Sequence, residues 1–278
     1  MTAVNLSTLL NKANKNNYAV AGLVVLGWED ALAFTQAADE TGIPIILQAG
    51  PSCRSYTPVP ILGKMFRYLA EQTKVNICCH IDHGYSIKEC KEGMDSGFTS
   101  VMYDGSKLPL KKNINNTYKI SKLAKSYKVS LEGEVGIVGY HNGKISEGTN
   151  LIEAKIFANE SGVDAMAISV GNTHLQTSKI AKIDINKILD IQKITKIPLV
   201  LHGSSGISYQ MRKKIASNTN VAKFNIGTEL RVIAGKSLRE SLNSNKKTFD
   251  RLQLMKPTII KIKNQAKKII KNIRNENR

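Results

Sequence analysis

The sequence predicts an α/β fold, a (β/α)8 TIM barrel that forms one domain over residues 1–278, and three observations lead to it. The chain has 278 residues, which is close to the upper limit of a single hydrophobic core. Short runs rich in β-branched residues alternate with amphipathic stretches along the chain. These runs are almost continuously apolar, which indicates strands buried on both faces and therefore a parallel sheet. Eight strand–helix units in about 250 residues match a barrel, and a doubly wound open sheet is the alternative.

The predicted elements follow one another in a regular order. Several helical patterns end in Gly, which favours a helix C-cap, or are followed by Pro. We expect a leading helix over 2–16, a barrel over about 18–245 and a C-terminal helical extension over about 249–278. The strands are expected over residues 18–25, 44–50, 75–82, 100–104, 129–136, 164–170, 198–203 and 221–227.

The composition excludes several classes of protein. Hydrophobic residues make up 42% of the chain and charged residues 22%, which is typical of globular domains and not of disordered, collagen-like or coiled-coil sequences. The sequence has no apolar run of about 18 residues, and its N-terminus lacks the features of a signal peptide. We therefore expect a soluble cytoplasmic protein that does not associate with membranes. The four cysteines show no CxxC spacing and no disulfide framework.

The net charge of +18 suits nucleic acid, an anionic membrane surface or anionic substrates as a partner. Much of the excess lies in lysine pairs and in the tail over 261–278, where it alternates with Ile and Asn. No aromatic residues are interleaved there to stack on bases. We therefore expect an ordinary solvated surface and no specific nucleic-acid partner.

Four of the five histidines stand at or near predicted strand ends, and only His141 lies in an evident loop. In a barrel, chemistry belongs to the C-terminal ends of the strands. His83, His174 and His202 come from three such ends on one rim, a pattern that can build a three-histidine Zn²⁺ site with an open fourth position. The alternative is that each imidazole makes only local hydrogen bonds. His80 is expected to be a buried, hydrogen-bonded neighbour.

Carboxylates accompany these histidines. Asp82 is adjacent to His83, so the two side chains leave the backbone in different directions, and one can bind metal while the other transfers a proton. Asp104 and Glu134 are expected to accept hydrogen bonds from ligand imidazoles. Glu132 shares a strand face with Glu134 by the period of two, and this face is expected to point into the barrel, with a surface-facing pair as the alternative.

Two loops resemble phosphate-binding segments. The stretches LHGSSGI and KFNIGTEL follow the seventh and eighth predicted strands, where barrels most often bind phosphate through backbone N–H groups and a helix N-terminus. The candidate phosphate-binding residues are Gly203, Ser204, Ser205, Asn225, Gly227 and Thr228.

The blocks HIDHG, VSLEGEVG, GVDAMAISVGNTH, KIPLVLHGSSGI and KFNIGTEL resemble the zinc-dependent class II fructose-bisphosphate and tagatose-bisphosphate aldolases. The resemblance implies an aldolase that cleaves or forms a ketose phosphate or bisphosphate through a dihydroxyacetone phosphate enediolate. It implies one Zn²⁺ on His83, His174 and His202, a metal-supporting role for Glu134, and Asp82 as the proton donor to the aldehyde oxygen.

The resemblance also implies a phosphate site for the ketone, a distal phosphate contact and an assembly of subunits. A monovalent cation would lie near the first phosphate, and Arg251 resembles the arginine that meets the distal phosphate. The family forms dimers or tetramers. The apolar stripe of the C-terminal helix is expected to need a surface for burial, and the alternative is that it packs on its own barrel. The stripe contains Ile259, Ile260, Ile262, Ile269 and Ile270.

The sequence departs from the family pattern on the aldehyde side. Asn142 stands where the family has the Glu that moves the proton at carbon, and an amide accepts no proton near neutral pH. We expect His141 or Glu147 to replace that base, with Glu132 as the next candidate. Val24 stands where the family has Asn at the end of the first strand, and Leu175 stands where the family has Gly. Both changes favour an acceptor aldehyde other than the ordinary triose phosphate.

Two other functions stay open. A catalytically degenerate family member with a binding or structural role is the main alternative, because the usual carbon base is missing. A barrel metal hydrolase is disfavoured, since the sequence has no His-x-His at the end of the first strand and no bridging lysine after the fourth.

Overall fold

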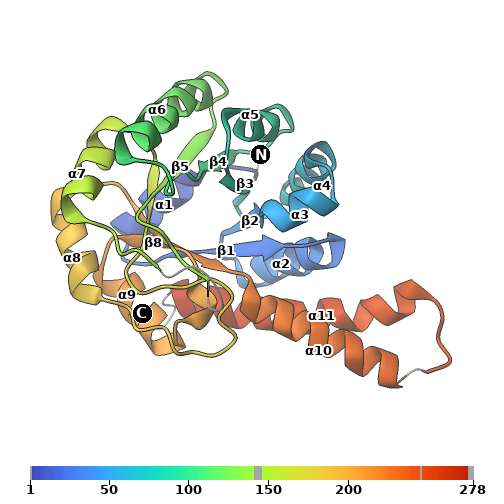
Figure 1. The fold of residues 1–278 in the computed structure, drawn as a ribbon. Helices are drawn as coiled ribbons and strands as arrows, with labels where there is room; N and C mark the ends of the chain where they lie inside the picture. The colour runs from blue at the N-terminus through green and yellow to red at the C-terminus, as the bar shows by residue number, and fades with distance from the viewer. Residues whose placement is uncertain (1, 141–145, 245, 275–278) are drawn as a thin grey trace.

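The structure is a computed structural model and describes residues 2–140, 146–244 and 246–274. It confirms the predicted barrel, because eight parallel strands pair in chain order and β1 closes against β8 (Figure 1). The strands are β1 Val20–Val25, β2 Ile45–Ala49, β3 Ile77–Gly84, β4 Ser100–Tyr103, β5 Ser130–Val135, β6 Ala165–Ile168, β7 Leu199–Leu201 and β8 Val221–Ile226.

Helices surround the barrel and begin and end where the sequence provides caps. Ser86, Asp184 and Ser208 each accept a backbone N–H at the start of a helix, and α2 ends at Gly42, whose φ is +69°. The helices are α1 Leu6–Lys15, α2 Trp28–Thr41, α3 Pro51–Tyr56, α4 Val59–Glu71, α5 Ile87–Asp95, α6 Leu110–Ser126, α7 Leu151–Glu160, α8 Ile185–Ile194, α9 Tyr209–Asn218, α10 Thr228–Ser244 and α11 Arg251–Arg274, with a 3-10 turn over Ser204–Gly206.

The leading helix α1 closes the N-terminal end of the barrel, as predicted. Leu6 and Leu10 of this helix are fully buried and belong to one cluster with Ile46, Cys78 and Val200 from the barrel interior. A second cluster fills the space between the outer face of the strands and the surrounding helices. The barrel interior is therefore apolar near the N-terminal ends of the strands. Polar side chains in the interior lie nearer the C-terminal ends.

The C-terminal extension is also confirmed, but its apolar stripe is covered within the same chain. Helices α10 and α11 form a hairpin that extends away from the barrel, and the end of α11 returns to pack beside α2 and α9 (Figure 1). Ile262, Ile269 and Ile270 are buried there. Because the barrel already buries most of the stripe, the stripe does not require a partner chain.

Two other sequence-based expectations concern cysteines and membranes. All four cysteines are free and buried. Within the described ranges, none of the helices is both long enough and apolar enough to cross a bilayer.

Candidate active site

The C-terminal ends of the strands surround a cavity of about 390 Å³. Its polar lining comes from α3, from β3 and the residue after it, from the segments after β5, β6 and β7, and from β8 and the first turn of α10. The residues that carry polar side chains there are Ser52, Asp82, His83, Tyr85, Tyr140, His174, Ser205, Asn225, Thr228 and Arg231. The remaining lining residues are Val24, Gly50, Pro51, Leu175, Gly203 and Gly227.

The structure brings the three predicted histidines together, with His83 and His174 in the lining of this cavity and His202 fully buried beside them. One ring nitrogen from each of His83, His174 and His202 lies within 4.8 Å of the others. The Nε2 atom of His83 and the Nδ1 atom of His202 are only 2.9 Å apart, and the two rings are nearly perpendicular. Three nitrogens from three separate strand ends therefore point to one place.

His83 is held in this orientation by its backbone and by a carboxylate. Its φ is +51°, which is uncommon for a residue other than Gly, and it lies where the pairing of β3 with β4 shifts register. Its Nδ1 lies 2.8 Å from Oδ2 of Asp104, whose other oxygen accepts bonds from the backbone and hydroxyl of Ser106. The contact with Asp104 leaves Nε2 of His83 free to face the other histidines.

His202 is held by a second carboxylate from inside the barrel. Its Nε2 lies 3.0 Å from Oε1 of Glu132, and Oε2 of Glu132 lies 2.5 Å from Nζ of Lys223. All three side chains are fully buried. Glu134 is buried as well, so the structure places the predicted glutamate pair inside the barrel rather than at the surface.

His174 is positioned by the segment that follows β5. Its backbone N–H donates to the carbonyl of Gly139, and its ring stacks on Tyr140 with the centroids 5.0 Å apart. Leu175 follows with a φ of +61°, a left-handed conformation that is strained for a branched side chain. Tyr140 and Leu175 both line the cavity, so this strained turn shapes its wall.

The charges around the histidines shift their protonation in different directions. Burial lowers the pKa of His83, but the carboxylates of Asp82 and Asp104 outweigh burial and raise it to about 9. Burial and the neighbouring charge of His83 lower the pKa of His174 to about 3, and the same two causes lower the pKa of His202 well below its usual value. Without metal, the three-histidine cluster therefore holds its proton on His83.

The pKa values of two acidic side chains beside the cluster, Glu134 and Asp82, are shifted in opposite directions. Burial and the charge of Asp104 raise the pKa of Glu134 to about 8. Burial would raise the pKa of Asp82, but His83, His202 and Lys223 together outweigh burial, and the pKa of Asp82 is lowered. Asp82 therefore carries a negative charge at the cavity wall, where its Oδ1 accepts a bond of 3.2 Å from Nδ2 of Asn225.

The residues at this cluster fit a metal ion. Oε2 of Glu134 is buried without a hydrogen-bond partner and lies 3.9 Å from Nδ1 of His202. A buried acceptor without a partner is costly unless a cation or proton lies beside it. His83, Asp104 and Glu134 form a second group with metal-ligand spacing. Imidazole nitrogens with nearby carboxylates are donors that suit zinc and similar divalent metals.

The predicted phosphate loops contribute to the lining of the cavity. Gly203 has a φ of +60°, and a Cβ atom there would lie 2.3 Å from the carbonyl oxygen of Thr173, so only Gly fits. Ser205, Asn225 and Thr228 also reach the cavity, and Thr228 begins α10, whose first N–H groups face anions favourably.

Ser204 differs from this expectation. It is fully buried, and its hydroxyl donates to the carbonyl of Leu201. It stabilises the turn and does not line the cavity.

Of the predicted site residues that the structure describes, Glu147 and Arg251 are not brought to the cavity within this chain. Glu147 is exposed, and its backbone pairs with Ile137 away from the cavity lining. Arg251 begins α11, and its side chain is 84% exposed with a guanidinium nitrogen 3.9 Å from Glu29. His141 lies outside the described residues.

Two arginines at the site were not expected from the sequence. Arg231 lies one turn after Thr228 on α10, lines the cavity, and has a buried Nε without a hydrogen-bond partner. Arg54 donates to the carbonyls of Ala49, Asp82 and His83 and so fixes the ends of two strands. Helical spacing from Thr228 could have revealed Arg231. Nothing in the sequence indicates that Arg54 contacts backbone carbonyl groups.

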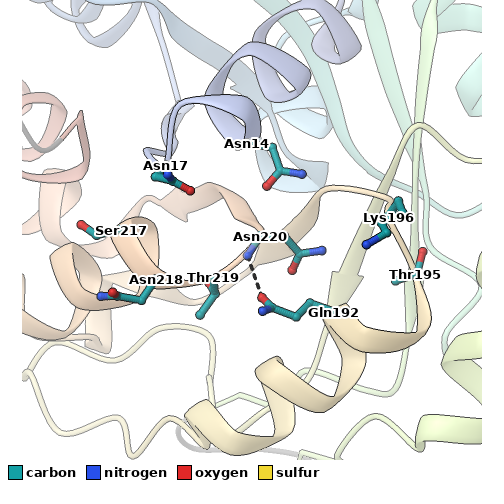
Figure 2. A pocket seen from close by; sticks show the side chains of 9 residues that line it. All are labelled: Asn14, Asn17, Gln192, Thr195, Lys196, Ser217, Asn218, Thr219 and Asn220. Atoms are coloured by element: carbon teal, nitrogen blue, oxygen red, sulfur yellow. Dashed lines mark hydrogen bonds between the residues drawn. The ribbon is translucent and has the colours of Figure 1, made fainter.

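A second hollow, of about 340 Å³, lies at the opposite end of the barrel, at the end of α1 and before β7 and β8. Figure 2 shows the side chains that line it. Its lining consists of amide and hydroxyl side chains with Lys196 as the one charged group among them. Gln192 accepts a bond of 3.0 Å from the backbone of Asn220 there. Carboxylates and imidazoles do not occur in this lining, so the chemistry belongs to the histidine end.

Comparisons with known proteins agree with this geometry. The family model for fructose-bisphosphate aldolase class-II matches residues 4–278. A fructose-bisphosphate aldolase of Staphylococcus aureus (strain Mu50 / ATCC 700699) is 32% identical and covers 100% of this chain and 99% of its own. A 6-phospho-5-dehydro-2-deoxy-D-gluconate aldolase of Shouchella clausii (strain KSM-K16) is 32% identical, with coverages of 98% and 94%.

Solved structures give the same result. The YdjI aldolase from Escherichia coli K12 superposes with a TM-score of 0.85 at 25% identity, over 98% of this chain and 97% of the other. The match runs through the strands that carry the histidines and through both phosphate loops. The chain therefore belongs to the class II fructose-bisphosphate aldolase family and is an aldolase.

Proposed function

We propose that the protein is a zinc-dependent aldolase that cleaves or forms a ketose phosphate or bisphosphate, with dihydroxyacetone phosphate as the ketone half. The observation that carries this proposal is the convergence of three imidazole nitrogens within 4.8 Å beside two phosphate-type loops. His83, His174 and His202 would hold the ion. Zinc bound there supplies a Lewis acid that polarises the ketone carbonyl.

The loops after β7 and β8 would bind the phosphate of the ketone. Gly203 and Ser205 offer backbone N–H groups, and the N-terminus of α10 at Thr228 adds a favourable dipole. The guanidinium of Arg231 lies beside Gly227, where a Cβ atom would be 3.6 Å from Nη2. Among the cavity-lining residues, Arg231 is the one lysine or arginine, so it is suited to a second anionic group of the substrate.

Asp82 would move the proton at the aldehyde oxygen. In the cleavage direction this residue accepts the proton of a substrate hydroxyl, and the lowered pKa of Asp82 keeps it ionised for that step. Asn225 holds its carboxylate toward the cavity. In the synthetic direction the same oxygen returns the proton to the aldehyde.

We place the carbon base on His141. Glu147 is exposed and does not line the cavity. Glu132 is fully buried, and both of its oxygens are engaged by His202 and Lys223. His141 directly follows Tyr140 in the sequence, and Tyr140 lines the cavity.

We also propose that the chain forms a dimer or tetramer through the free end of the α10–α11 hairpin. Phe249 is 97% exposed and Leu252 is 67% exposed there, which is unfavourable for a chain that stays alone in water. Arg251 lies between them and cannot reach its own cavity. The hairpin would bring Arg251 to the cavity of a partner chain.

Proton exchange tests the proposed reaction. Zinc-loaded protein incubated in deuterated water with dihydroxyacetone phosphate and no aldehyde is expected to exchange a carbon-bound proton, measured by NMR. Asp82→Ala should keep this exchange and lose cleavage. His141→Ala should slow exchange by roughly 10²–10⁴-fold, the usual contribution of a general base, and Glu147→Ala should serve as the matched control with little change. No exchange by the zinc-loaded protein would favour the degenerate family member.

The pH dependence of metal uptake tests the charge distribution. Because the pKa of His83 is raised to about 9 in the metal-free protein, zinc must displace its proton below that pH. The apparent affinity measured by chelator competition should therefore rise about tenfold per pH unit up to about pH 9 and then level off. Asp104→Asn should move the plateau to lower pH. An affinity that is constant between pH 7 and 9 would contradict this distribution.

Light scattering tests the assembly. At micromolar concentration the protein is expected to scatter as a dimer or tetramer, and Leu252→Asp should shift it to a smaller species because it places a charge in the proposed contact. Lys268→Asp, an exposed position on the same helix beside the barrel, is the matched control and should not change the mass. A wild-type protein that is monomeric under these conditions would refute the oligomer.

A further inference from the structure

We propose that Lys223, buried inside the barrel, is a positioning residue for the metal site. Its ammonium group holds Glu132 so that Oε1 accepts the Nε2–H proton of His202. His202 then keeps its other nitrogen, Nδ1, turned toward His83 and His174. This inference rests on the proposed metal-dependent function and assigns a role to a residue that does not line the cavity.

Hydrogen bonds link Lys223 to Glu132 and Glu132 to His202, and each oxygen of the Glu132 carboxylate has one hydrogen-bond partner. Lys223 Nζ lies 2.5 Å from Oε2 of Glu132, and His202 Nε2 lies 3.0 Å from Oε1. A carboxylate can only accept, so Nε2 of His202 carries the hydrogen and Nδ1 is left with a free lone pair. Because the two oxygens are held by different partners, the plane of the carboxylate is fixed.

Lys223 is itself held from a second side. Its Nζ lies 3.3 Å from Nε2 of His80, and Nδ1 of His80 lies 2.8 Å from the hydroxyl of Ser100. An ammonium group can only donate, so Nε2 of His80 accepts and Nδ1 donates to Ser100. His80, Ser100 and Lys223 are all fully buried. The ammonium therefore has two fixed acceptors from different strands and little freedom to move.

A need for stability does not account for this ion pair. Replacing a buried ion pair with apolar residues of similar volume is often neutral or stabilising, because both charges lose their hydration on burial. A role in covalent chemistry is also unsuited, since Lys223 is 0% exposed and a lysine that forms a Schiff base must meet the substrate carbonyl. Orientation of His202 is the role that accounts for the contacts of Lys223 with Glu132 and His80 and for the contact of Glu132 with His202.

Matched substitutions at positions 132 and 223 separate orientation from packing. Lys223→Met removes the ammonium, leaves Glu132 without its partner, and is expected to weaken Zn²⁺ and Co²⁺ binding by roughly 10–100-fold. Glu132→Gln should have a similar effect, because Lys223 attracts the single amide oxygen and turns the NH2 group toward Nε2–H of His202.

Two double variants make the test specific. In Glu132→Gln with Lys223→Met, the amide is free to flip, so its oxygen accepts from His202 and its NH2 group donates to Nε2 of His80. This variant should recover most of the metal affinity. Glu132→Leu with Lys223→Met removes both charges and should unfold at a temperature near that of the wild-type protein. It should nevertheless bind metal roughly 10–100-fold more weakly, because nothing accepts from His202.

The readouts are the Zn²⁺ dissociation constant by chelator competition, the visible spectrum of the Co²⁺-loaded protein, and thermal unfolding. Lys91→Met, which breaks the exposed ion pair with Asp95, is the control and should leave all three unchanged. Equal metal affinity in the two double variants would overturn the positioning role. Unchanged affinity in Lys223→Met would overturn it as well, with the metal site intact. A wild-type protein that binds neither ion would instead refute the metal site on which it rests.

Discussion

Two buried contacts between a carboxylate and an imidazole determine the geometry of the active site. Asp104 holds Nδ1 of His83, and Glu132 holds Nε2 of His202. Each contact occupies one ring nitrogen and turns the other toward the same point, where the two free nitrogens lie 2.9 Å apart. Without these acceptors, the imidazoles could rotate or adopt the other tautomer, and the three nitrogens would no longer converge.

The barrel supports these contacts by arranging its interior in levels. Apolar side chains such as Ile46 and Val200, together with α1, fill the lower level. Above them lies a fully buried polar level that contains Glu132 and Lys223. The cavity opens above this level. Because this polar level is fully buried, each of its hydrogen bonds is stronger than it would be at the surface, and its geometry is correspondingly rigid.

The sequence predicted the parts of the site that depend on strand position. The strand ends that carry His83, His174 and His202 could be placed from the apolar runs before them, and the period of two placed Glu132 and Glu134 on one inward face. The positions of the candidate phosphate loops followed from their place after the last two strands. These positions were predictable because in a closed parallel barrel the position along a strand decides the level in the molecule.

Other parts of the site could not be predicted, because they depend on geometry that periodicity does not encode. Lys223 lies in a strand that is otherwise mostly apolar, and it pairs with Val200 across a register shift between β7 and β8. Ser204 stands in a phosphate-type loop, yet the turn directs its hydroxyl back to Leu201. The sequence of the C-terminal helix did not indicate which surface covers its apolar stripe. The structure shows that most of this stripe packs on the chain's own barrel.

X-ray diffraction at the zinc absorption edge, on crystals of the zinc-loaded protein, tests the central claim most directly. The account predicts one zinc bonded at about 2.0–2.1 Å to Nε2 of His83, Nδ1 of His202 and a ring nitrogen of His174. Nε2 of His202 should still contact Glu132 in that crystal, and His174→Ala should abolish the zinc peak. A zinc ion bound by other residues, or His202 turned so that Nε2 binds the ion and Glu132 loses its contact, would contradict the account.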